Sequence, residues 1–216
     1  MWGRSPFNYV GDIPRYQGRP LVTNDTDAST QPSRALRADA RRNRDAILAA
    51  AREVFETEGV LAPLDGIAVR ARVGNATLYR NFPVRDDLLA AVLRANVEEA
   101  LTESDTFARD LPAKEALSEW LFHLVWQLRI WHDLPYCVAT AQGDPDSSMN
   151  SATNPLLLRT DALLDAAKAS GTAHPDITAA EVFELATTLS WGLDRFHDDR
   201  DAARRRVRIG TAGVFV

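Results

Sequence analysis

Residues 67–88 read IAVRARVGNATLYRNFPVRDDL, and this stretch decides the fold of the chain. The spacing of Ile67, Ala68 and Ala71 predicts one face of a short helix. A tight turn over residues 73–75 follows, and a second short helix then ends before a proline. Two short helices around a small turn form a helix-turn-helix, whose second helix can enter the major groove of DNA.

The composition is that of a globular protein. The chain has 216 residues, enough for one sizeable domain or two small ones, and its hydrophobic content of 45% predicts a real core. The single cysteine, Cys137, excludes an internal disulfide and suits a reducing compartment. We expect it to be a small buried apolar residue rather than a redox sensor. No apolar run approaches a membrane span, and the first residues lack a signal peptide's apolar core, so we expect a cytoplasmic protein.

Positive charge is concentrated around the helix-turn-helix. Residues 34–85 carry ten Arg and six Asp or Glu, a net of +4, although the whole chain has a net charge of −5. Residues 86–216 carry 12 Lys or Arg against 21 Asp or Glu. A basic segment on an acidic body orients a protein on a polyanion. Nearly all the cations are Arg, which binds phosphate and guanine edges in a two-point geometry.

Composition and periodicity divide the chain into three parts. Residues 1–33 are rich in small and polar residues, show no helical period and are expected to form a disordered arm. Residues 34–84 are predicted to be a three-helix DNA-binding domain, and residues 85–216 a helical ligand-binding and dimerisation domain. No strand pattern or repeat is present, so the fold class is all-α. We expect about nine helices, near residues 34–58, 63–72, 75–81, 85–105, 112–131, 134–141, 155–171, 178–191 and 198–210.

The quoted stretch resembles the DNA-binding domain of the tetracycline-repressor (TetR) family of transcription regulators. The family pattern is Ile-Ala, Ala-Gly-Val-Ser, Gly-Thr-Leu-Tyr, an aromatic residue, Phe, and Lys-Glu-x-Leu. The matching segments here are Ile67-Ala68, Ala71-Arg72-Val73-Gly74, Ala76-Thr77-Leu78-Tyr79, Asn81-Phe82 and Arg85-Asp86-Asp87-Leu88. The chain departs from the pattern at Arg72, Gly74, Ala76 and Asn81. The resemblance covers about residues 40–90.

The candidate DNA-binding residues lie on the second short helix and beside it. Thr77 and Tyr79 resemble the family's phosphate-contacting positions, and Arg85 matches its Lys at the start of the fourth helix. Asn75 and Arg80 are the candidates for base edges, because Asn reads adenine and Arg reads guanine in two-point contacts. The full set comprises Arg41, Arg44, Asn75, Ala76, Thr77, Tyr79, Arg80, Asn81 and Arg85.

The resemblance also implies that the second domain binds a small-molecule effector. Aromatic residues and polar groups crowd residues 113–136, where they could line a largely apolar cavity or form ordinary core packing. The candidate ligand-binding residues are Trp120, His123, Leu124, Gln127, Trp131 and Trp191.

The last two predicted helices are the candidates for dimerisation, since the family builds a four-helix bundle from them across a two-fold axis. Their apolar stripe could serve a subunit core or a dimer interface. The candidate residues are Val182, Leu185, Ala186 and Leu189.

These features predict a ligand-responsive transcriptional regulator that binds a palindromic operator in double-stranded DNA as a homodimer, and the family resemblance implies that it is a repressor. One alternative is a helical architectural DNA-binding or interaction protein without an effector. The other is an enzyme, but no metal-ligand spacing, phosphate loop or nucleophile motif is present. Asp194, His197 and Asp198 have a spacing that a metal could use, yet such clusters are usually surface. We therefore expect no catalytic residues, no metal and no cofactor.

Overall fold

The computed structural model describes residues 34–216, which form nine α-helices and one short 3-10 helix. The expected arm over residues 1–33 lies outside the described residues. The all-α prediction is confirmed over the described part of the chain. The helices are α1 Arg34–Glu58, α2 Leu64–Arg70, α3 Asn75–Asn81, α4 Arg85–Asp110, α5 Ala113–Leu128, α6 Leu134–Gln142, α7 Ser148–Ala169, α8 Ala179–Phe196 and α9 Arg200–Gly210, followed by the 3-10 helix Ala212–Val214.

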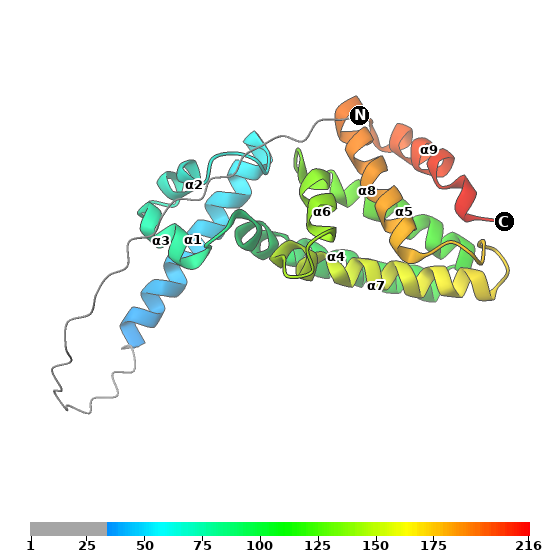
Figure 1. Ribbon diagram of the computed structural model, residues 1–216, viewed down its shortest axis with the longest axis horizontal. Helices are drawn as coiled ribbons and strands as arrows, with labels where there is room; N and C mark the ends of the chain where they lie inside the picture. The colour runs from blue at the N-terminus through cyan, green and yellow to red at the C-terminus, as the bar shows by residue number, and fades with distance from the viewer. Residues whose placement is uncertain (1–33) are drawn as a thin grey trace, which may run out of the picture.

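Helices α1 to α3 form a small bundle at one end of the molecule (Figure 1). One apolar face of α1 contributes Ile47 and Phe55 to its core, and α2 contributes Ile67. Leu78 of α3 and Phe82 after it are completely or almost completely buried in the same core. Burial of these side chains fixes α3 against α1 and leaves its opposite face free.

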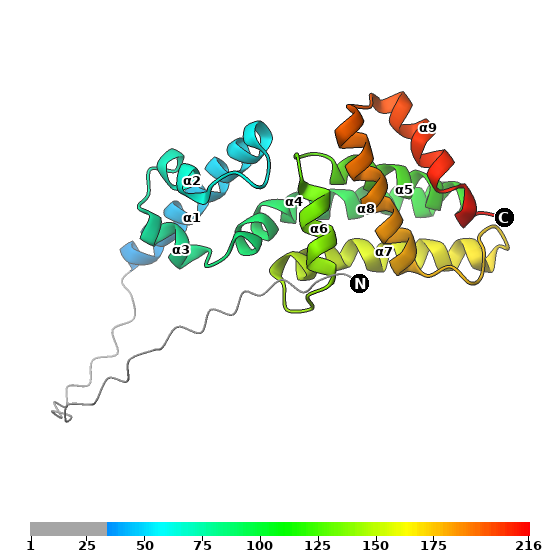
Figure 2. The same ribbon diagram turned by 45° about the horizontal axis from the view of Figure 1, so that its top comes forward.

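Helix α4 runs from this bundle into the second half of the molecule, where it lies alongside α7 (Figures 1 and 2). Asp86 and Asp87 lie in its first turn, where negative charge is favoured. The Asp87 carboxylate also accepts a hydrogen bond of 3.3 Å from the backbone N–H of Val84. Helix α4 extends beyond the predicted end near residue 105, to Asp110.

Helix α5 is the centre of the second half and contacts α4, α7, α8 and α9. Its buried side chains include Trp120 and Leu121, whose exposed fractions are zero. Helices α8 and α9 lie at the end of the molecule opposite to α2 and α3 (Figures 1 and 2). None of the helices within residues 34–216 is both long and apolar enough to cross a membrane.

The predicted loop over residues 142–153 is wrong in its second half, because α7 begins at Ser148. The Ser147 hydroxyl caps the helix by accepting from the backbone N–H groups of Met149 and Asn150, at 3.1 and 3.3 Å. Pro155 therefore lies inside α7 and does not open it. Burial of Met149 and Thr153 stabilises the two turns that precede the proline.

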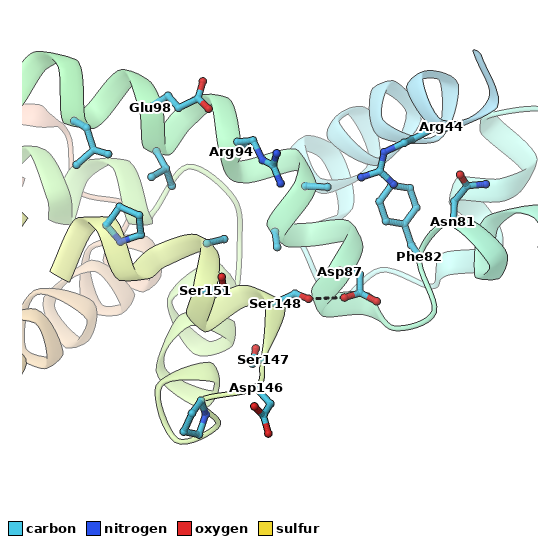
Figure 3. A pocket seen from close by; sticks show the side chains of 17 residues that line it. Arg44, Asn81, Phe82, Asp87, Arg94, Glu98, Asp146, Ser147, Ser148 and Ser151 are labelled. Atoms are coloured by element: carbon cyan, nitrogen blue, oxygen red, sulfur yellow. Dashed lines mark hydrogen bonds between the residues drawn. The ribbon is translucent and has the colours of Figure 1, made fainter. Parts of the chain in front are cut away.

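Two serine–aspartate hydrogen bonds join the start of α7 to the start of α4. The Ser147 hydroxyl donates to Asp86 at 3.1 Å, and the Ser148 hydroxyl donates to Asp87 at 2.5 Å. Figure 3 shows the second of these bonds. They fix the start of α4, only a few residues beyond α3, against the second half of the molecule.

We predict that Ser147→Ala lowers stability, because it removes both the cap of α7 and the bond to Asp86. A lost N-cap costs about 1–2 kcal/mol, which lowers the Tm of a chain of this size by about 2–8 °C. Ser151→Ala on the same helix is the matched control, since the Ser151 hydroxyl makes no hydrogen bond within residues 34–216. Thermal unfolding followed by circular dichroism measures both; equal Tm values for the two variants would contradict the assigned cap.

Candidate functional site

The turn between α2 and α3 has a well-defined backbone geometry. Ala71 ends α2, and Arg72 has a left-handed φ of 56°. The Arg72 N–H donates to the Val69 carbonyl at 3.1 Å, and the Val73 N–H to the Ala68 carbonyl at 3.0 Å. This pair of bonds is the Schellman ending of a helix. It sets the direction in which α3 leaves the turn.

The outward face of α3 carries several of the predicted DNA-binding residues. Ala76, Tyr79 and Arg80 are exposed, and Thr77 is half-buried. Tyr79 is 45% exposed although it is a large aromatic residue. The structure thus brings these four side chains together on one short helix, on the side that the core does not use.

Two other predicted residues of α3 make hydrogen bonds within the chain. The Asn75 amide donates to the Asp65 carboxylate at 3.0 Å, which fixes its orientation against α2. The Asn81 amide donates to the Thr77 carbonyl at 2.8 Å, within the last turn of α3. An Asn that reads adenine must present one N–H and its carbonyl oxygen together. Asn75 retains its oxygen and one amide hydrogen for such a contact.

The predicted arginines have different surroundings. Arg41 is exposed on α1, whereas the Arg44 guanidinium lies 4.4 Å from the centre of the Phe82 ring, a cation–π contact. One nitrogen of Arg85 donates to the carbonyls of Val60 and Ala62, at 2.6 and 2.7 Å. Arg85 thereby holds the connection between α1 and α2, and a contact of Arg85 with DNA would use its other N–H groups.

The connection between α1 and α2 also contacts the loop between α5 and α6. The Val60 N–H donates to the His132 carbonyl at 3.1 Å. Gly59 has a φ of 84°, and a Cβ at this position would lie 3.2 Å from Cβ of His132. Both facts favour glycine here. Phe55 of α1 also packs against Trp131, with ring centroids 5.6 Å apart. We call this set of contacts the α1–α5 junction.

A small cavity lies between α4, α5, α6 and α7, with a volume of about 30 Å³. Two of the predicted ligand-binding residues, Leu124 and Gln127, line it. Its other lining residues are Leu93, Asn96, Val97, Ala100, Leu128, Leu134, Thr153 and Leu156. The amides of Asn96 and Gln127 make no hydrogen bond within residues 34–216, so this mostly apolar cavity has free donors and acceptors.

Sequence reasoning missed Asn96 and Thr153. A signal for Asn96 was present, since it is polar and lies between Leu93 and Val97 on the apolar face of α4. Thr153 fell in the segment predicted to be a loop, so its position on a helix facing α4 was not accessible from the pattern.

Three predicted ligand-binding residues are part of the core and do not line this cavity. The indole N–H of Trp120 donates to the Thr160 hydroxyl at 2.9 Å. Trp131 belongs to the α1–α5 junction. His123 is stacked on Trp120, and its Nδ1 lies 3.0 Å from the Glu103 carboxylate, whereas its Nε2 is buried without a hydrogen-bond partner in the described structure. Burial lowers the pKa of His123 below its ordinary value, against the opposing effect of Glu103.

Trp191, the remaining predicted ligand-binding residue, is half-exposed on α8. It lines a separate groove of about 610 Å³ between α6 and α8, together with Tyr136. Of the predicted dimer residues, Val182 and Ala186 are buried inside the subunit. Leu185 and Leu189 are only partly buried, so the subunit leaves part of this stripe uncovered.

A larger cleft of about 900 Å³ separates the start of α7 from the α1–α3 bundle. Arg44 and Phe82 line it from the bundle, Arg94 and Glu98 from α4, and Ser148 from α7 (Figure 3). Its charged rim carries both signs. The cleft leaves solvent-accessible space between the start of α7 and the bundle.

Cys137 is buried, and burial raises the pKa of its thiol to about 11. A thiol with this pKa is protonated at neutral pH and therefore a poor nucleophile. This agrees with the interpretation of Cys137 as a packing residue.

The architecture is that of a helix-turn-helix protein with a helical effector domain, and the comparisons give its family. The model of bacterial regulatory proteins of the tetR family matches residues 47–92, and that of the C-terminal domain of SbtR-like transcriptional regulators matches residues 112–215. The TetR transcriptional regulator SCO0520 of Streptomyces coelicolor is 30% identical, with a TM-score of 0.51 over 80% of this chain and 98% of its own. The chain belongs to the TetR family of transcriptional regulators.

Two more distant structures share the fold. A tetR-family regulatory protein from Rhodococcus RHA1 is 20% identical, with a TM-score of 0.57 over 80% of this chain and 96% of its own. The transcriptional regulator FadR of Bacillus subtilis, solved in complex with stearoyl-CoA, is 17% identical, with a TM-score of 0.57 over 79% of this chain and 98% of its own. A comparison with curated protein sequences gave no match.

We predict that His123 makes stability decrease as the pH falls from about 7 to 5. Its folded-state pKa is lower than the unfolded value of about 6.5, so below that value the unfolded state binds the proton more readily. His123→Phe should make the unfolding free energy less dependent on pH in this window. Glu103→Gln should make it more dependent, because Glu103 raises the pKa of His123. Urea unfolding at several pH values measures both slopes, and slopes that both equal that of the wild type would refute the assignment.

Proposed function

We propose that this TetR-family protein is a homodimeric repressor that binds a palindromic operator and is released by a small-molecule effector. The observation that carries the proposal is the outward face of α3. Thr77, Tyr79 and Arg80 lie there together, on a helix fixed by a buried core and within residues 34–85, whose net charge is +4. An exposed aromatic residue and cation on a positioned short helix suit the major groove of DNA.

Base reading and backbone contact are assigned to different residues of this interface. We assign base reading to Arg80 and Asn75, the latter through its remaining N–H and its oxygen. We assign contacts with phosphate to Thr77, Tyr79 and Arg41. Such contacts fix the position of a reading helix on DNA but do not read the sequence. Two copies of α3 in one dimer would lie about 34–36 Å apart, one turn of DNA. The protein would act in the cytoplasm, where bacterial DNA is.

Dimerisation is assigned to the uncovered side of α8 and to α9. Leu185 and Leu189 are partly exposed there, and Phe196 and Ile209 are largely exposed. Residues 185, 189 and 196 lie four and seven apart along α8, so they follow one face of the helix. Apolar side chains grouped in this way favour burial against a second copy.

The cavity between α4 and α7 is the proposed effector site. At about 30 Å³ it has room for a water molecule but not for an effector, so binding must separate the helices around it. Leu93 and Asn96 line the cavity from α4, and the same helix begins at Arg85, directly after α3 and Phe82. A displacement of α4 therefore changes the position of the bundle that carries α3.

An effector can act only by binding the released arrangement more tightly than the DNA-bound one. The α1–α5 junction and the serine–aspartate bonds are the contacts that would differ between these arrangements. An architectural DNA-binding protein without an effector would have the same reading helix but would show no such coupling.

The first test is DNA binding by the intact protein to a fragment of its own upstream DNA. We expect salt-dependent binding that prefers this fragment to a scrambled one. Thr77→Ala and Tyr79→Ala should weaken binding to both fragments, whereas Arg80→Ala should reduce the preference by about 1–3 kcal/mol.

Arg94→Ala is the matched control for Arg80→Ala, because Arg94 is an exposed arginine on the cleft wall. Absence of any preference in the wild-type protein would refute the proposed function. An unchanged preference in Arg80→Ala would refute only the assignment of base reading.

The second test is effector binding, measured as thermal shift against a panel of metabolites. A ligand present at 100 times its dissociation constant stabilises the folded protein by about 2.7 kcal/mol. Gln127→Leu should reduce the shift given by any effector found, because it removes a polar group from the cavity wall. The matched control is Gln142→Leu, on the separate α6–α8 groove. A larger loss in Gln142→Leu than in Gln127→Leu would place the effector in that groove instead.

A further inference from the structure

The turn before α3 contains an arginine in a backbone conformation that disfavours it. Three non-glycine residues within residues 34–216 have a positive φ: Arg72, Asp133 and His197. Asp and His are among the residue types enriched in this region, and Arg is not. Gly74, two residues further, has a φ of −72°, which any residue adopts. In this turn, glycine occupies position 74, whose φ suits any residue, whereas arginine occupies position 72, whose positive φ favours glycine.

Within residues 34–216, the Arg72 side chain makes no contact that offsets the strain of its backbone conformation. It is exposed and makes no hydrogen bond or ion pair within the described part of the chain. Asp133, by contrast, uses its carboxylate to bind Arg195 at 2.6 Å. The bonds that form the Schellman ending at Arg72 are made by backbone N–H groups alone, so glycine would make them equally well.

Strain that the fold does not require is concentrated at functional positions in proteins. Arg72 immediately precedes the segment that starts α3, and its guanidinium extends from the turn without a partner. Its neighbour Arg70 lies 3.8 Å from Glu53 and is partly neutralised. Among the arginines of α2 and this turn, Arg72 is therefore the one without an ion-pair partner in the described structure, and it is also nearer in sequence to α3.

We propose that Arg72 contacts a DNA phosphate beside the major groove and that the strained turn is retained for this contact. This inference rests on the proposed DNA-binding function and adds a residue to the interface. A phosphate is the expected partner, because segments beside a reading helix contact the backbone and the helix itself reads bases. Arg72 thus contributes affinity for DNA of any sequence.

The test compares three variants by fluorescence anisotropy on the upstream fragment and on a scrambled fragment, at several salt concentrations. Arg72→Ala removes the charge and keeps a side chain in the strained position. Arg72→Gly removes the charge and the strain. Arg109→Ala is the matched control, since Arg109 is an exposed arginine in the last turn of α4, outside both the α1–α3 bundle and the proposed dimer face.

Both Arg72 variants should bind each fragment about tenfold more weakly than the wild type at 0.1 M salt. The slope of log Kd against log salt should fall by about 0.9 for each lost contact, hence by about 1.8 for two subunits. Arg109→Ala should bind as the wild type. The Tm of Arg72→Gly should rise by about 2–4 °C, because glycine adopts the left-handed conformation without strain.

The outcomes separate this inference from the proposed function. Wild-type binding that Arg72→Ala leaves unchanged overturns the role of Arg72 alone. A lower Tm in Arg72→Gly also overturns it, since the arginine would then serve the fold. A wild-type protein that binds neither fragment overturns the proposed function and this inference with it.

Discussion

The position of the DNA-binding bundle depends on how the connection between α1 and α2 satisfies its backbone. The carbonyls of Val60 and Ala62 accept from the Arg85 guanidinium, and the Val60 N–H donates to the carbonyl of His132. Buried backbone groups without partners are costly, so these bonds are strongly favoured. One partner is at the start of α4, and the other lies in the loop after α5. The short connection is therefore bonded both to the start of α4 and to the loop after α5, which couples the position of the bundle to these two elements.

The loop after α5, which belongs to this junction, also contacts α8. His132 Nδ1 lies 2.9 Å from the Asp194 carboxylate, and the Arg195 guanidinium binds the next residue of the loop, Asp133. Asp194 and Arg195 belong to the last turn of the helix that we assign to the dimer interface. A single loop of the chain thus contacts the reading half, the cavity-forming helices and the dimerisation helix. This loop therefore links the reading half to the helix that we assign to the dimer interface.

Structure could be predicted from the sequence most successfully where one local pattern determines it. The spacing over residues 67–88 specified both short helices, because their ends are set by nearby residues. The sequence pattern failed at α7, which it predicted to begin at Pro155. The helix begins at Ser148, because the Ser147 cap and the burial of Met149 stabilise the turns before the proline. Trp120 and Gln127 were both candidate ligand-binding residues, but only packing shows that the first binds Thr160 and the second lines the cavity. Likewise the apolar stripe of α8 contains Val182, which the subunit itself buries.

Pro155 has a consequence for the mechanics of α7. A proline has no N–H, so the carbonyl four residues before it, that of Ser151, lacks its helical donor. The hydrogen-bond ladder of α7 is therefore weakest at this position, with two turns before it and a longer segment after it. The first two turns are therefore held mainly by the Ser147 cap and by the burial of Met149 and Thr153. Because Thr153 lies in these two turns and lines the proposed effector site, a displacement of this part of its wall would leave the longer segment of α7 after Pro155 in place.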